Sequence, residues 1–132
     1  MPGYVYLTIA EVIEIHRQLI EEFGGSPELA NLGRLEAALF RPQTGYYTDL
    51  VEEAAVLMES LANNNAFVDG NKRVSFAVTD TFLRLNGFYL EVDPQAAHDF
   101  VTQRMARGEF RFRVICDRLR PLTRPLPPKG RG

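Results

Sequence analysis

The chain of 132 residues is 45% hydrophobic and 24% charged with a net charge of −2, the composition of one soluble globular domain. This length supports a core without a metal or disulfide, and the single cysteine, Cys116, favours a reducing, cytoplasmic location. The sequence contains no apolar run of ~18 residues and no signal-peptide pattern, so we expect neither a membrane span nor a membrane partner.

Two helices are predicted in the first third of the chain. The first covers residues 9–23, because Thr8 and Glu11 have the spacing of a capping box and apolar positions recur at helical intervals up to the glycines that follow. The second, shorter helix covers residues 32–40 and ends before Pro42.

A third helix is predicted to follow Thr48 or Asp49, either of which can be its cap. Its apolar positions define a buried face, so its acidic residues are expected to face solvent: Glu52, Glu53 and Glu59.

The second half of the chain is predicted to add three helices. An extended piece over residues 88–92 separates the first of these helices from the others, which are expected over residues 71–86, 93–107 and 110–120. The segment 121–132, rich in proline, glycine and basic residues, is expected to be a disordered tail, which leaves residues 1–120 as the domain. The predicted fold class is all-α, a compact bundle of about six helices around the helix at 71–86, with at most a minor β-hairpin.

The charges are distributed unevenly along the chain. Residues 1–103 carry 15 acidic and 6 basic side chains, a net charge of −9, whereas residues 104–132 carry 2 acidic and 9 basic ones, a net charge of +7. The basic part is either a solvated surface or a docking site for an acidic protein. No nucleic-acid-binding motif accompanies it, so we expect no direct nucleic-acid partner.

The polar stretch that precedes the helix at 71–86 has the chemistry of an anion site. Gly70 permits backbone torsions closed to other residues, and Asn71 follows at a helix start whose free amides attract phosphate. Lys72 adds a point charge and Arg73 a planar fork that matches phosphate oxygens. Asp69 is an oxygen ligand suited to the Mg²⁺ that accompanies ATP. The alternative for so short a stretch is a turn with two solvated cations.

From Phe67 to Arg73 this stretch resembles the signature of the Fic/Doc family, whose general form is His-x-Phe-x-(Asp/Asn)-(Gly/Ala)-Asn-(Lys/Gly)-Arg. Phe67 is expected to anchor the loop to the core. Residues 33–42 and 82–87 are similar to the segments on either side of the signature in that family, and the resemblance covers about residues 4–120. It implies a Fic/Doc-like helical fold.

Lys72 favours one branch of the family. Adenylyltransferases of the Fic type have glycine at this position, whereas lysine is similar to the Doc (death-on-curing) toxins of toxin–antitoxin systems. That resemblance implies an antitoxin partner and ATP- and Mg²⁺-dependent phosphorylation of a protein hydroxyl, a threonine of elongation factor Tu, which blocks translation. Adenylylation of a protein target and a catalytically dead binding module are the alternative functions.

The family's catalytic histidine is replaced here by Asn65. An amide cannot take the proton from an attacking hydroxyl, so the chain as written is expected to be nearly inert. An engineered substitution, a naturally degenerate binding protein and a displaced catalytic base are the three explanations. The third is the least favoured, because His16 and His98 belong to distant predicted helices and are expected to be ordinary surface or packed residues.

Overall fold

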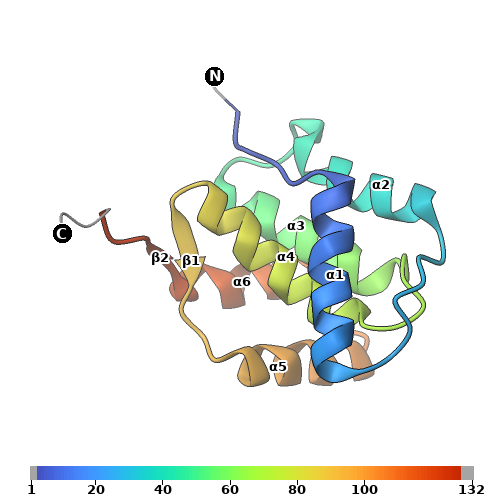
Figure 1. Ribbon diagram of the computed structural model, residues 1–132. Coiled ribbons are helices and arrows are strands. Elements are labelled where there is room, and N and C mark those ends of the chain that lie inside the picture. The colour runs from blue at the N-terminus through green and yellow to red at the C-terminus, as the bar shows by residue number, and fades with distance from the viewer. Residues whose placement is uncertain (1–2, 129–132) are drawn as a thin grey trace.

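The computed structural model describes residues 3–128 and consists mainly of helices (Figure 1). Its helical elements are α1 (Ile9–Phe23), α2 (Leu32–Phe40), the 3₁₀ helix η1 (Arg41–Thr44), α3 (Leu50–Asn63), α4 (Asn71–Leu85), α5 (Pro94–Ala106) and α6 (Phe112–Leu122). Two short strands, β1 (Phe88–Leu90) and β2 (Thr123–Pro125), complete the fold. The predicted all-α class with six helices is confirmed.

The helix starts follow the local signals in the sequence. The Thr8 hydroxyl accepts from the Glu11 amide at 3.2 Å, and the Glu11 carboxylate accepts from the Thr8 amide at 2.8 Å, so the predicted capping box is present. The Asp49 carboxylate accepts from an amide in the first turn of α3, and the Asp93 carboxylate accepts from two amides in the first turn of α5. Asn31, whose side chain accepts from the Arg34 amide, is a cap that the sequence analysis did not identify.

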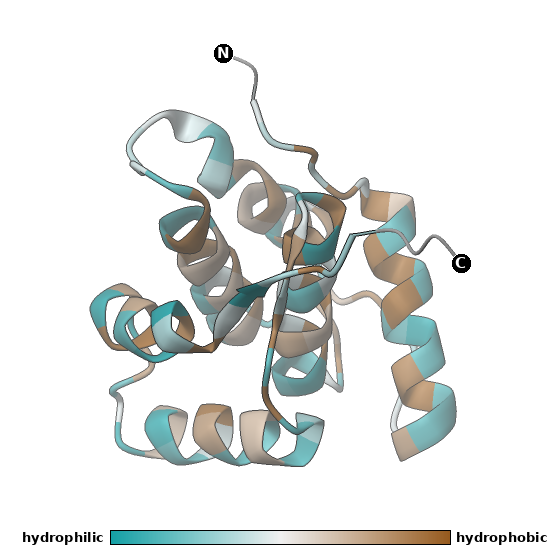
Figure 2. Ribbon diagram, turned by 90° about the vertical axis from the view of Figure 1, so that its left-hand side faces the viewer, coloured by the Kyte–Doolittle hydropathy of each residue, from teal (hydrophilic) through white to brown (hydrophobic). Residues whose placement is uncertain are grey.

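Helix α3 is the most deeply buried element, with eleven of its fourteen residues in the interior. It packs against α4 and α6, and α4 in turn contacts α1 and α5 (Figure 1). Helix α1 lies at the edge of the bundle and separates its apolar and polar residues onto different faces (Figure 2). Within residues 3–128, no helix has the length and hydrophobicity needed to cross a bilayer.

Two of the three acidic residues predicted to face solvent from α3 are buried instead. Glu53 and Glu59 are only 9% and 7% exposed, because neighbouring elements surround α3. Glu53 accepts a hydrogen bond from the Tyr6 hydroxyl at 2.7 Å. Glu59 accepts from the Phe112 amide at 2.9 Å and lies 2.9 Å from the Arg41 guanidinium. The two carboxylates therefore connect α3 to three other segments of the chain.

Burial raises the pKa of the Glu53 carboxyl, although the bond from Tyr6 opposes the shift. A raised folded-state pKa means that the protonated form stabilises the fold and that this stability is lost as pH rises through the folded pKa. Glu53→Gln keeps an acceptor for Tyr6 without the charge, so we expect a higher melting temperature than the parent at neutral pH and no difference in acid. Thermal unfolding followed by circular dichroism at both pH values, with the exposed Glu36→Gln as control, measures this effect. A variant that is less stable than the parent by the same amount at both pH values would contradict it.

The prediction of a disordered segment from residue 121 onward is wrong for residues 121–125, which are ordered by the pairing of β1 with β2. Strands β1 and β2 pair antiparallel, with Tyr89 opposite Arg124, so they come from distant parts of the chain and do not form a hairpin. Residues 121–125, expected to be disordered, instead complete α6 and form β2. The backbone of β1 supplies hydrogen-bonding partners for this segment, and an ion pair of 3.0 Å joins Arg124 to Glu91. Residues 129–132 of the predicted tail lie outside the described residues.

Candidate phosphate-binding site

The loop between α3 and α4 is held in place by its own backbone and by the segment that follows α1. The Ala66 carbonyl accepts from the amides of Ala30 and Asn31, and the Val68 amide donates to the Glu28 carbonyl. These bonds place the signature stretch beside the segment that connects α1 to α2, far from it in sequence. The loop therefore has a defined conformation before any ligand binds.

Asn71 closes this loop with its side chain. Its amide oxygen accepts from the Phe67 N–H at 3.2 Å, and its amide nitrogen donates to the Phe67 carbonyl at 2.8 Å. The Phe67 ring is 2% exposed and lies in the core. Both polar atoms of the Asn71 side chain therefore already bind the loop, and the second N–H of its amide nitrogen and its backbone N–H are the donors left for a ligand.

Position 70 requires glycine, both because of its backbone conformation and because neighbouring side chains leave little room for a Cβ. Its φ of +80° is left-handed, and a Cβ at this position would lie 3.3 Å from the His16 ring. No side chain among residues 3–128 caps α4 at this residue. The free amides at the amino end of this 15-residue helix are therefore open to an anion.

The His16 side chain packs against the loop, although it was predicted to lie on a distant helix. Its Nε2 lies 2.7 Å from the Asp69 carbonyl, which can only accept, so this nitrogen carries the proton. The ring stacks on Phe67 with centroids 3.7 Å apart and is 1% exposed. His16 is thus a packed residue that contacts the signature stretch directly. The sequence held no signal for this contact beyond a histidine within the predicted helix at 9–23.

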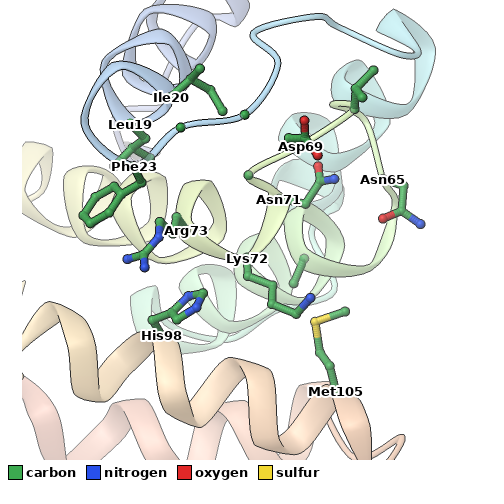
Figure 3. A pocket seen from close by; sticks show the side chains of 15 residues that line it. Leu19, Ile20, Phe23, Asn65, Asp69, Asn71, Lys72, Arg73, His98 and Met105 are labelled. Atoms are coloured by element: carbon green, nitrogen blue, oxygen red, sulfur yellow. The ribbon is translucent and has the colours of Figure 1, made fainter.

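A pocket of about 470 Å³ opens between α1, the loop, the amino end of α4, and α5 (Figure 3). Most of its apolar lining comes from α1, and the rest from Ala62 of α3, Val68 of the loop and Met105 of α5. All of the predicted site residues except Phe67 line it, and its polar side chains are Asn65, Asp69, Asn71, Lys72, Arg73 and His98.

The two cations of the signature both reach this pocket. The Arg73 guanidinium lies over the Phe23 ring, 3.7 Å from its centroid. This cation–π contact orients the guanidinium against the end of α1. The side chain of Lys72, the residue before Arg73, also extends into the pocket (Figure 3). In the described part of the chain, no carboxylate oxygen lies within 4 Å of either cation. Their positive charge is therefore available to an anionic ligand.

The Asp69 carboxylate pairs with neither Lys72 nor Arg73 and does not cap α4. Instead its Oδ2 accepts from the Ser26 amide at 2.7 Å, because the turn after α1 brings that N–H to the loop. No partner for its second oxygen is found among residues 3–128, and no cluster of three ligating side chains exists there. A single carboxylate suits Mg²⁺ that is held mainly by substrate phosphates.

Asn65 lies at the rim of the pocket and is exposed to solvent. Its φ of 52° makes it the one non-glycine residue with positive φ in the described chain. Asparagine and histidine are both enriched in this left-handed region, so the backbone here accommodates either residue.

His98 also reaches the pocket, from α5, which corrects the expectation that it lies far from the signature. The reason is that α5 packs against α4, a contact between segments that the sequence alone does not bring together.

These features define a helical protein with a pocket lined by two cations at the start of α4, and the chain belongs to the Fic/DOC family, whose sequence profile matches residues 6–83. The chain is 32% identical over 121 residues to the protein kinase doc of Escherichia phage P1, covering 89% of this chain and 94% of that protein. It is 47% identical over 76 residues to the toxin Doc of Mycolicibacterium smegmatis, covering 54% of this chain and 58% of that protein. The predicted resemblance to Doc-type toxins is confirmed.

Proposed function

We propose that this chain is the toxin of a toxin–antitoxin pair and that its fold serves ATP-dependent phosphorylation of a protein hydroxyl. The observation that carries the proposal is the pocket in which Lys72 and Arg73, without carboxylate partners in residues 3–128, adjoin the uncapped amino end of α4. The printed names of the two relatives, a toxin and a protein kinase, support it. The proposal extends, by family resemblance, to an antitoxin partner, a cytoplasmic location and a threonine of elongation factor Tu as the substrate.

Each site residue has a distinct part in this proposal. The amides at the start of α4 and the side chains of Lys72 and Arg73 would hold the terminal phosphate of ATP, which supplies the phosphoryl group. Asp69 would contribute one oxygen to the Mg²⁺ that accompanies the nucleotide. Asn65 can orient the hydroxyl of the substrate by a hydrogen bond but cannot remove its proton, so the chain is proposed to be nearly inactive.

Two other functions are considered beside this one. Adenylylation would require the pocket to hold the inner phosphates of ATP, and the Lys72 side chain, which extends into the pocket, favours a single terminal phosphate instead. A binding module without activity is favoured by Asn65 alone.

Transfer of labelled phosphate tests the proposal and separates the alternatives. The Asn65→His variant and the parent would each be incubated with purified elongation factor Tu or bacterial lysate, and with ATP labelled at the γ- or the α-phosphate. Transfer of the γ-label by the variant supports a kinase, and transfer of the α-label shows adenylylation. Absence of both, with ATP still bound, points to a binding module.

Asp69→Asn tests the metal assignment. An asparagine at this position keeps an acceptor for the Ser26 amide but loses the charge, so we expect an unchanged fold and roughly tenfold or greater weakening of Mg²⁺-dependent ATP binding. Calorimetric titration of ATP with and without Mg²⁺ measures the effect, with the exposed Asp117→Asn on α6 as control. Mg²⁺ added to the ATP-free parent should not bind tightly, and tight binding there would show that the metal site is misassigned.

A further inference from the structure

His98 occupies a position in the pocket that neither the family signature nor the predicted mechanism uses. It projects from α5 beside Lys72 and Arg73, the two cations of α4 (Figure 3). Its Nδ1 is buried and has no hydrogen-bond partner among residues 3–128. Because Nδ1 has almost no accessible surface, the other ring nitrogen, Nε2, is the atom that a ligand in the pocket can reach.

The charges around His98 are predominantly positive. Lys72 and Arg73 face it from α4, Asp99 is its neighbour on α5, and Asp69 lies on the loop that lines the same pocket, while the lining residues of α1 are uncharged. Burial, followed by the charges of Arg73 and Lys72, lowers the pKa of His98, and Asp99 only partly opposes this. Without an anion the imidazole is therefore neutral at neutral pH.

A phosphate in the pocket changes this balance. Its negative charges offset Lys72 and Arg73, and its oxygens offer acceptors to a ring that would donate as an imidazolium. We propose that His98 is a third phosphate ligand of this pocket and takes up one proton from solvent when the terminal phosphate of a nucleotide binds. The inference rests on the proposed function, because it concerns the same anion. It predicts that ATP binds more tightly in mild acid than in mild alkali.

A displaced catalytic base at His98 would have the opposite protonation state in the nucleotide complex. A base must be neutral while the nucleotide is bound, whereas a phosphate ligand is protonated in the complex. The protonation state of His98 in the ATP complex therefore distinguishes the two roles without any measurement of activity.

Proton NMR of the two histidines tests the inference on the full chain. The resonance that is lost in His98→Gln belongs to His98, and the one that remains belongs to His16. We expect ATP with Mg²⁺ to raise the pH midpoint of His98 by at least about one unit, equivalent to about tenfold tighter binding to the protonated form. In His98→Gln, calorimetry should show roughly severalfold weaker ATP binding near pH 6, approaching about tenfold as the pH falls further, and no loss near pH 8.5.

The outcomes separate this inference from the proposed function. An Arg107→Gln control, which changes a charge on the exposed residue after α5, should keep both the midpoint shift and the affinity. If ATP binds and the His98 midpoint stays unchanged or falls, or if His98→Gln binds ATP as well as the parent near pH 6, the inference is wrong and the proposed function stands. If the parent binds no ATP at either pH, the proposed function fails and the inference fails with it.

Discussion

Asn65→His is expected to raise phosphate transfer about 10²–10⁴-fold, the usual contribution of a general base, and to make expression of the chain arrest growth. The position is suited to the change because Asn65 is exposed at the rim of the pocket and its φ of 52° is accessible to histidine. The phosphate-binding residues of the proposed site need no further change. Under the proposed function, the missing proton acceptor is the main barrier that this substitution removes.

Rates of γ-phosphate transfer from purified proteins and growth curves after induction measure this gain. Asn64→His is a matched control, because it adds the same side chain one position earlier, outside the lining of the phosphate pocket. Combining Asn65→His with Arg73→Ala should remove the gained activity. A folded Asn65→His protein that binds ATP but neither transfers phosphate nor slows growth would contradict the kinase assignment.

Arg73→Ala is expected to weaken ATP binding by about 10–100-fold, the cost of losing charge-assisted hydrogen bonds to phosphate. Lys72→Ala should cost less, because lysine is a flexible point charge, whereas the Arg73 fork is held in one orientation by the Phe23 ring at 3.7 Å. Phe23→Leu, which removes the ring but keeps an apolar side chain, should give an intermediate loss.

Calorimetric titration of ATP into each variant ranks these contributions. Arg107→Ala serves as the control for a general loss of positive charge, since this exposed arginine is outside the pocket lining. Affinities of Arg73→Ala and Lys72→Ala equal to that of the parent would show that neither side chain reaches the nucleotide.

Much of the fold could be predicted from the sequence because it depends on interactions within a few residues. The capping box of Thr8 and Glu11 and the caps Asp49 and Asp93 satisfy backbone amides in their own first helical turn. The loop and helix start from Phe67 to Arg73 are likewise contiguous, so their residue types alone indicated the family, and the proposed anion site comes from the same stretch. Local geometry of this kind is encoded in neighbouring side chains.

The tertiary structure alone decided which distant groups meet. Glu53 and Glu59 have the pattern of a polar face, but packing on several sides of α3 buries them. His16 and His98 carry no local signal, yet the packing of α1 and α5 on α4 brings one beneath the signature loop and the other into its pocket. These contacts arise because burying apolar surface fixes how the helices pack, and the polar groups they carry are then brought together across long stretches of chain.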